Sequence, residues 1–224
     1  MDIQETKPIS HYEYRIEIDE KAVKQQALRY LNEITGWCSE QKGAILVDMI
    51  LKKKPEKIVE IGVWAGKSLL PMAYTLKAMG RGKVYGIDPW SAEASIQHVT
   101  NEPNIVWWSH VDHDGILLSL INNIKRWQLE DYVEIIINTS ENADPIEDID
   151  LLHIDGNHSD YASYLDVNKW VPLVKSGGWI IFDDMSWNEN GIATTARAVK
   201  WLDENCIKMA EFQEDCSWGV WIKP

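Results

Sequence analysis

Apolar residues recur at three- and four-residue spacing in two early segments of the chain. In the segment from Glu20 to Trp37, apolar positions such as Ala27, Leu31 and Ile34 share one face of a helix. The second segment is residues 41–54, and Pro55 ends it after a run of lysines that suits a helix C-terminus. The first quarter of the chain therefore predicts two helices.

From residue 57 onward, short apolar runs alternate with helical patterns. The runs predict strands at residues 57–62, 83–88, 132–138, 150–155 and 179–184. The helical patterns cover residues 67–79, a segment ending at Trp127, residues 160–175 closed by the glycines 177–178, and residues 191–206. A long polar and aromatic stretch, Pro89 to His113, has no clear period.

This alternation predicts a parallel sheet with right-handed crossovers. The tail differs, because the strands predicted at residues 208–215 and 217–224 have no helix between them. Such a pair forms an antiparallel hairpin, which we expect at one edge of the sheet.

Composition narrows the class of protein. The 224 residues are 45% hydrophobic and 25% charged, which suits one domain with an appended piece. A net charge of -13 argues against nucleic acid as a partner. The three cysteines suggest reduced thiols, and no apolar stretch approaches the roughly 20 residues of a membrane span. We therefore expect a cytoplasmic protein with no membrane or nucleic-acid partner and no signal peptide.

The stretch VEIGVWAGKS, Val59 to Ser68, predicts a tight turn from a strand to a helix. Glu60 stands where a dinucleotide-binding fingerprint has its first glycine, and it would repel a phosphate. It suits an ammonium group instead. Asp88 ends the next predicted strand, where an acid can take the hydroxyls of a ribose. A ribose joined to an amino-acid ammonium describes S-adenosyl-L-methionine.

A second group of acids follows two later strands. Asp155 ends one of them, and Asp183 with Asp184 ends the other. The carboxyl ends of parallel strands meet at one edge of a sheet, so we expect the three carboxylates to converge. A divalent cation such as Mg²⁺ would offset their repulsion. The alternative is that these acids only cap turns and helices.

These motifs resemble the class I S-adenosylmethionine-dependent methyltransferases, and more narrowly the metal-dependent O-methyltransferases. The resemblance covers roughly residues 41–224. It implies an α/β fold with a Rossmann-like, doubly wound, seven-stranded and mostly parallel sheet, a C-terminal antiparallel hairpin and an N-terminal helical extension. Residues 41–224 would form the methyltransferase domain, and residues 1–40 a helical lid or a segment that joins a homodimer.

The resemblance also implies roles for individual residues. Glu60 would face the methionine ammonium, Ser68 the methionine carboxylate, Asp88 the ribose and Ser140 the adenine. Gly62 and Gly66 would shape the turn, and Trp90 could lie along the adenine. The alternatives are a purely structural turn, a helix cap at Ser68 and plain packing of Trp90. Asp155, Asp183 and Asp184 would hold the cation.

His158 lies three residues after Asp155, and a histidine of near-neutral pKa can accept a hydroxyl proton. We expect His158, or Asp155, to act as the catalytic base. His158 as a fourth metal ligand, or as a helix-start residue without chemistry, stays open. His153, on the strand itself, is expected to point away from the site and to pack in the core.

The predicted activity is metal-dependent methyl transfer from S-adenosyl-L-methionine to a hydroxyl of a small molecule. A sugar, a secondary metabolite or a catechol-like diol fits, and Trp37 or Trp187 could cover it. A metal-dependent hydrolase and a non-catalytic nucleotide-binding protein on the same fold are the rival interpretations.

Overall fold

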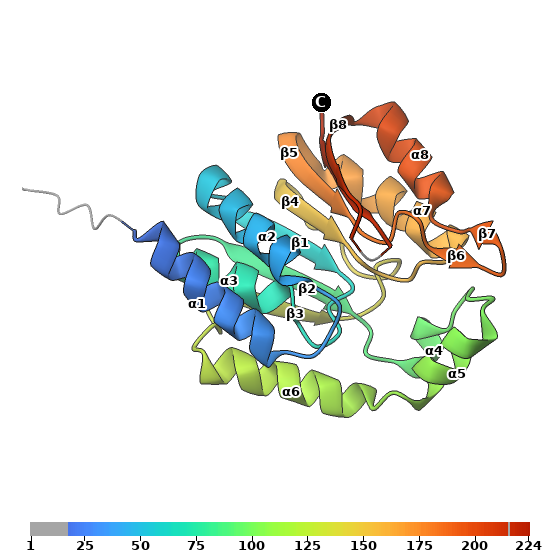
Figure 1. The fold of residues 1–224 in the computed structure, drawn as a ribbon, viewed down its shortest axis with the longest axis horizontal. Helices are drawn as coiled ribbons and strands as arrows, with labels where there is room; N and C mark the ends of the chain where they lie inside the picture. The colour runs from blue at the N-terminus through green and yellow to red at the C-terminus, as the bar shows by residue number, and fades with distance from the viewer. Residues whose placement is uncertain (1–17, 215) are drawn as a thin grey trace, which may run out of the picture.

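The computed structural model describes residues 18–214 and 216–224, so the first 17 residues of the predicted lid or dimer segment lie outside it. Its centre is a seven-stranded sheet in the order β3-β2-β1-β4-β5-β9-β8 (Figure 1). The strands are β1 (Lys57–Ile61), β2 (Lys83–Asp88), β3 (Val133–Ile137), β4 (Ile149–Ile154), β5 (Val174–Phe182), β8 (Ile207–Phe212) and β9 (Trp218–Ile222). The first five are parallel, and β9 pairs antiparallel with both β5 and β8. The predicted sheet and its edge hairpin are confirmed.

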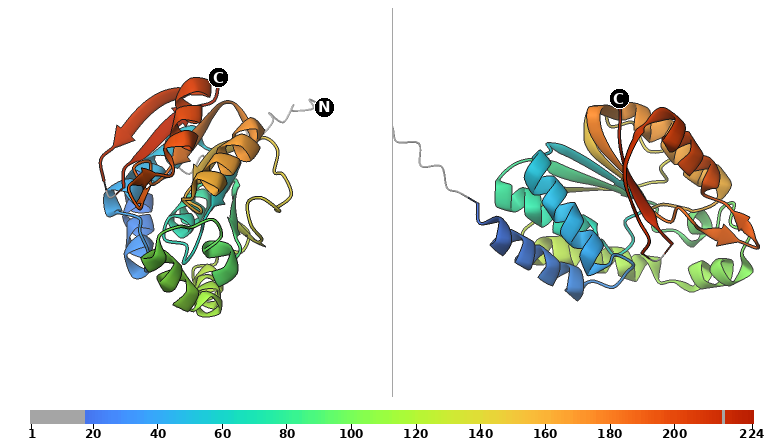
Figure 2. Two further views of the ribbon diagram at one scale, coloured as in Figure 1. Left: turned by 90° about the vertical axis from the view of Figure 1, so that its right-hand side faces the viewer. Right: turned by 45° about the horizontal axis from the view of Figure 1, so that its top comes forward.

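Helices cover both faces of this sheet (Figure 2). One face packs against four helices that precede β3 in the sequence, and the other face packs against two helices that follow β4. The first set is α1 (Glu20–Glu33), α2 (Glu40–Lys53), α3 (Leu69–Met79) and α6 (His113–Arg126). The second set is α7 (Asp160–Trp170) and α8 (Ala196–Asn205), with the short 3₁₀ turn Val171–Leu173 after α7. The central strands are therefore buried on both sides, as their continuous apolar runs require.

Side-chain caps fix where the helices beside the sheet begin. The hydroxyl of Ser39 accepts from the Lys42 amide at 3.0 Å, and that of Ser159 accepts from the Ala162 amide at 3.3 Å. Such caps satisfy amides that have no partner within the helix. They place the first turns of α2 and α7 at the carboxyl ends of the strands.

Two predicted helix boundaries are wrong because strand pairing takes their residues. The glycines 177–178 lie inside β5 and do not close α7, since their backbone groups exchange hydrogen bonds with Lys223. The predicted helix 191–206 begins only at Ala196, because Ile192–Ala193 (β7) pairs with Asn188–Glu189 (β6). A third boundary differs without any strand pairing, because the first helix ends at Glu33 and not at the predicted Trp37.

The stretch from Pro89 to His113 is partly helical, and it lies beyond the carboxyl ends of the strands. It contains α4 (Ala92–Ser95) and α5 (Glu102–His110), on the same side of the molecule as the β6–β7 hairpin (Figure 1). The carboxylate of Glu189 accepts from the Thr100 amide at 2.7 Å and from its hydroxyl at 2.8 Å. These bonds join two segments that are far apart in the sequence.

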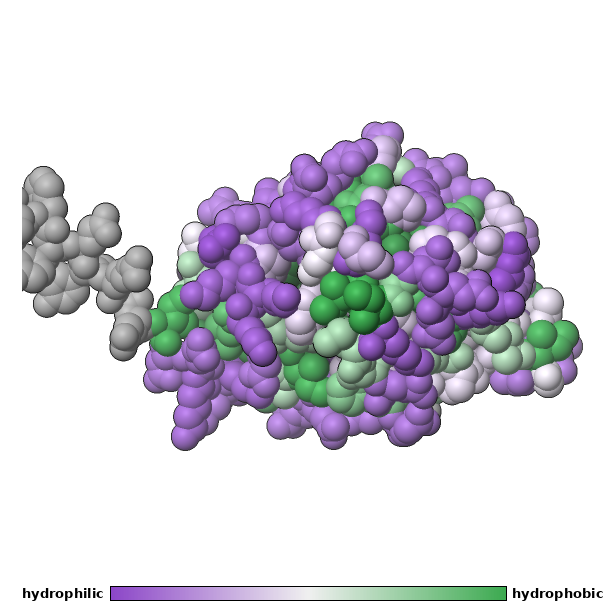
Figure 3. All heavy atoms as spheres, turned by 90° about the horizontal axis from the view of Figure 1, so that it is seen from above, coloured by the Kyte–Doolittle hydropathy of each residue, from purple (hydrophilic) through white to green (hydrophobic). Residues whose placement is uncertain are grey.

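The face drawn in Figure 3 is mostly hydrophilic, with a small apolar patch near its middle. Among residues 18–214 and 216–224, no helix has the length and apolar character needed to cross a bilayer.

Replacing Gly62 by Ala should destabilise the protein through a steric clash. Gly62 has a φ of +82°, and a Cβ there would lie 2.0 Å from the backbone oxygen of Asp155. We expect a loss of roughly 3 kcal/mol in the free energy of unfolding, from backbone strain plus overpacking. Urea denaturation measures it. Gly80→Ala is the matched control, because Gly80 has a φ of +65° and the added carbon would meet no described atom within 4 Å apart from those next to it along the chain. Equal losses in the two variants would contradict the clash.

Candidate functional site

A cavity of about 540 Å³ opens at the carboxyl ends of β1, β2, β4 and β5. This is where open α/β sheets place their ligands. Most of the predicted site residues line it: Gly62, Ser68, Asp88, Ser140, Asp155, His158, Asp183 and Asp184. Glu60, Gly66 and Trp90 do not. The sheet therefore brings Asp88 and the acids that follow the later strands to one cavity.

The carboxylate of Asp88 is held by the glycine turn. Its Oδ2 accepts from the amides of Val63 and Trp64, both at 2.9 Å, and its Oδ1 accepts from the Trp90 amide at 2.8 Å. Burial raises the pKa of Asp88, and these amide bonds act in the opposite direction. The Asp88 carboxylate is thus fixed at the cavity wall, and Oδ1 keeps acceptor capacity for a ligand hydroxyl.

Glu60 lies beneath the cavity and is fully buried. Its Oε1 accepts from the Ser68 hydroxyl and lies 2.8 Å from Nδ1 of His153, while Oε2 has no partner among the described residues. The structure thus links Glu60 to the protein's own groups. Its predicted contact with a ligand ammonium stays a prediction.

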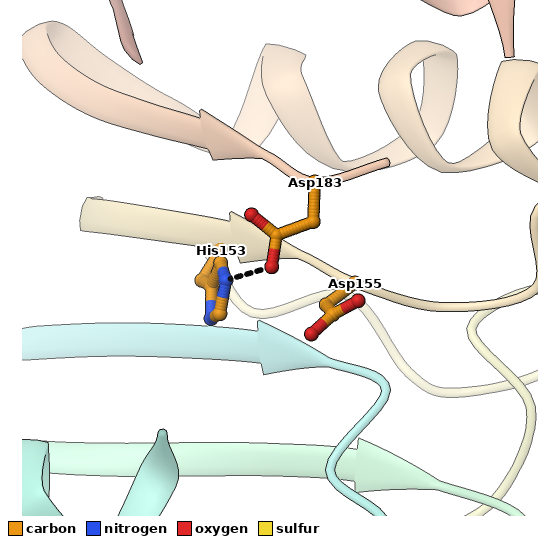
Figure 4. A group of neighbouring side chains, drawn as sticks. All are labelled: His153, Asp155 and Asp183. Carbon is orange, nitrogen blue, oxygen red and sulfur yellow. Dashed lines mark hydrogen bonds and ion pairs between the residues drawn. The ribbon is translucent and has the colours of Figure 1, made fainter. Parts of the chain in front are cut away.

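His153 is a core residue, but the expectation that it points away from the site is wrong. In the register of β1 with β4, His153 stands opposite Glu60. His153 also precedes Asp155 by two residues, and side chains two apart in a strand share a face. Its Nε2 lies 3.1 Å from Oδ2 of Asp183. Figure 4 marks this contact with a dashed line. His153 therefore connects Glu60 to the carboxylate group.

Lys42, from the first turn of α2, completes this chain of charges. Its side chain is buried, and its ammonium contacts Oδ2 of Asp183. Burial raises the pKa of Asp183, but Lys42 and His153 outweigh it and hold the pKa below its usual range. Sequence reasoning missed Lys42. The one signal was a lysine at a helix N-terminus, where the helix dipole disfavours a cation.

The carboxylates form two overlapping groups instead of one trio. Asp155 gathers with His153 and Asp183, and also with His158 and Asp184, with the ligand atoms of each group within 4.8 Å of one another. In Figure 4, Asp155 and Asp183 approach each other from neighbouring strand ends. Burial, and then the charge of Asp183, raise the pKa of Asp155 well above its ordinary value.

These groups fit a hard divalent cation. The Oδ1 atom of Asp183 is buried and has no hydrogen-bond partner among the described residues. Such an orphaned acceptor beside a second carboxylate is a place where an ion restores the balance. The donors are carboxylate oxygens with one imidazole, which suits Mg²⁺ or Mn²⁺.

His158 lies at the more open side of the carboxylates. Its Nε2 is 3.0 Å from Oδ2 of Asp184, and both side chains are half-buried. Its ring lies 4.8 Å from that of Trp187, which also lines the cavity. A nitrogen at that position can reach a hydroxyl in the cavity or coordinate an ion. The geometry accommodates either role.

Helix α7 holds the loop that carries Ser140. The Lys169 ammonium donates to the carbonyl oxygens of Ser140, Glu141 and Ala143 at 2.7–2.8 Å. The Trp170 indole donates to the Ser140 carbonyl at 3.2 Å. These bonds keep Ser140 at the cavity wall.

Tryptophans from three segments form one wall of the cavity. Trp37 precedes α2, Trp64 stands in the glycine turn, and Trp107 with Trp108 belongs to α5. The rings of Trp37 lie 4.7 Å from those of Trp64 and 5.4 Å from those of Trp107. Trp37 is nevertheless 64% exposed. Trp37 and Trp187 thus both line the cavity, as their predicted role requires.

Solved structures share this fold. The O-methyltransferase NovP has a TM-score of 0.67 at 16% identity, over 92% of this chain and 99% of that one. The O-methyltransferase TomG from Streptomyces achromogenes, solved with SAM, has a TM-score of 0.60 at 14% identity, over 93% and 92% of the chains. The O-methyltransferase from Bacillus cereus, solved with SAH, has a TM-score of 0.58 at 16% identity, over 94% of each.

Sequence comparison adds a relative and a family. The "Uncharacterized protein R132" of Acanthamoeba polyphaga mimivirus is 33% identical over 129 residues, which is 56% of this chain and 50% of that protein. The chain thus spans about half the length of this curated relative. The family model described as "Methyltransferase domain" matches residues 59–185, from β1 to the end of β5 with its acids. Since that match covers more than half of the sequence, the chain belongs to the methyltransferase domain family.

Proposed function

We propose that this protein transfers a methyl group from S-adenosyl-L-methionine to a hydroxyl oxygen of a small molecule, with a divalent cation such as Mg²⁺ at the carboxylates. The observation that carries the proposal is a single cavity lined both by Asp88 with the glycine turn and by Asp155, Asp183 and Asp184. The family match and the structures solved with SAM or SAH support the choice of cofactor.

Residues at one end of the cavity bind the cofactor, and residues at the other end hold the cation and remove the proton of the acceptor hydroxyl. At one end, Asp88 accepts from the ribose hydroxyls, Ser68 meets the methionine carboxylate and Ser140 borders the adenine. At the other end, Asp155, Asp183 and Asp184 hold the cation with His158 beside them. A bound divalent cation would lower the pKa of an acceptor hydroxyl. His158 then takes the proton of that hydroxyl, and the fixed walls supply the orientation.

The acceptor is a small molecule with neighbouring oxygens, such as a sugar, a secondary metabolite or a catechol-like diol. The tryptophan wall offers flat apolar faces to a ring, and the acids offer acceptors to its hydroxyls. A screen of hydroxylated compounds for methylated product tests this part of the proposal.

Calorimetric titration with S-adenosyl-L-methionine, with and without Mg²⁺, tests the function as a whole. We expect binding of both ligands. A protein that binds neither is not this enzyme. A metal-dependent hydrolase would bind the cation without any affinity for S-adenosyl-L-methionine, and a nucleotide-binding protein would show the reverse.

Replacing Asp155 by Asn should weaken cation binding and spare the cofactor. Asp155 belongs to both groups of potential ligands, so its charge counts in either. We expect the Kd for Mn²⁺ to rise at least about tenfold, which corresponds to about 1.4 kcal/mol, with the cofactor Kd nearly unchanged. Calorimetry or Mn²⁺ paramagnetic resonance measures it. Asp144→Asn, at an exposed acid outside the cavity, is the control. An unchanged Mn²⁺ Kd in Asp155→Asn would contradict the proposed site.

Replacing His158 by Gln should lower the rate of methyl transfer and leave cofactor binding intact. General-base catalysis is worth roughly 10² to 10⁴ in rate, so we expect kcat to fall by about 10²-fold or more. The rate of the variant should also lose the pH dependence that a histidine base produces. His110→Gln, at an exposed histidine outside the cavity, should keep full activity. A His158→Gln protein with the parent rate and pH profile would remove His158 from the chemistry.

A further inference from the structure

Lys42 lies in a place where lysine is rarely found. Lys42 is only 4% exposed, and it lies in the first turn of α2, three residues after the N-cap Ser39. Lysines are almost never buried unless paired, and a cation near a helix N-terminus opposes the helix dipole. Burial and the helix dipole both disfavour a lysine at this position, so neither accounts for its presence. The contact with Asp183 does.

The positive charge of Lys42 lies next to several carboxylates and compensates part of their negative charge. Asp183 and Glu60 are buried and Asp155 is half-buried, and His153 lies between Asp183 and Glu60. Within the described part of the chain, Asp183 pairs with Lys42 and with His153, whose imidazole is charged only when it is protonated. The ammonium is therefore the permanent positive charge at this cluster.

The two oxygens of Asp183 have different surroundings. Oδ2 contacts both Lys42 and His153, whereas Oδ1 is buried without a hydrogen-bond partner among the described residues. Two donors on one oxygen fix the rotation of a carboxylate. They hold the Asp183 carboxylate next to Asp155, with which it shares a group of potential ligand atoms.

We propose that Lys42 is a built-in counter-ion of the carboxylate cluster, which holds Asp183 in its ligand orientation without a metal and sets the affinity for the divalent cation by its own charge. The proposal rests on the cation site of the proposed function. It makes α2 part of that site, because a helix from the N-terminal part of the chain supplies the counter-charge.

The direction of the effect follows from charge. Lys42 repels a divalent ion bound at the neighbouring oxygens, and in a buried site this repulsion is strong. Loss of the ammonium also removes one of the two donors on Oδ2, but His153 keeps that oxygen in place. The change in charge therefore outweighs the change in positioning, and a neutral residue at position 42 tightens cation binding.

The test compares Lys42→Met with the parent protein by Mn²⁺ titration and thermal unfolding. Methionine is an unbranched side chain that matches lysine up to the ammonium nitrogen and carries no charge. We expect the Mn²⁺ Kd to fall at least about tenfold, with a lower melting temperature in chelator and a larger stabilisation by Mn²⁺ than in the parent protein. Lys42→Arg keeps the charge, so its Mn²⁺ Kd should stay near the parent value.

Lys24→Met is the matched control, because Lys24 pairs with Asp48 between α1 and α2, outside the cavity. It should leave the Mn²⁺ Kd unchanged. An equal or weaker Mn²⁺ affinity in Lys42→Met, or a variant that stays unfolded at saturating Mn²⁺, would overturn the inference. A parent protein that binds no Mn²⁺ would instead refute the cation site itself, so the two failures are distinguishable.

Discussion

The structure depends on keeping several charges buried at the edge of an apolar sheet. Lys42, Asp183, His153 and Glu60 form a continuous chain of contacts from α2 across β5 and β4 to β1. Removing one partner of such a chain leaves an uncompensated charge, which costs far more than the chain contributes to stability. The four residues therefore constrain one another, and they fix how α2 sits on the strand ends.

The strand-end acids were predictable because the sheet is parallel. A strand that is buried on both faces has a continuous run of apolar residues in the sequence. Asp88, Asp155 and Asp183 each follow such a run directly. Once the alternation of strands and helices gives parallel pairing, these acids must meet at one edge. The mostly parallel sheet and its C-terminal antiparallel hairpin follow from the same alternation together with the family resemblance, whereas the order of the strands comes from the structure.

Other features depend on contacts between distant segments. Lys42 and Asp183 are far apart in the sequence, and no local pattern indicates that α2 delivers a cation to β5. The helix boundary at Ala196 is set by the pairing of β6 with β7, which propensity alone does not reveal. His153 is a different case, because its position two residues before Asp155 already placed it on the same face.

The hydrogen bonds between Thr100 and Glu189 hold together an outer part of the cavity that is distinct from the part carrying the acids. The acids stand on the rigid sheet, whereas the outer walls come from α4, α5 and the β6–β7 hairpin, which contribute no strand to that sheet. Insertions or deletions in these two excursions would reshape the entrance and leave the buried charges undisturbed. Changes in these two segments can thus alter which ligand the cavity admits, while the buried acids on the sheet stay the same.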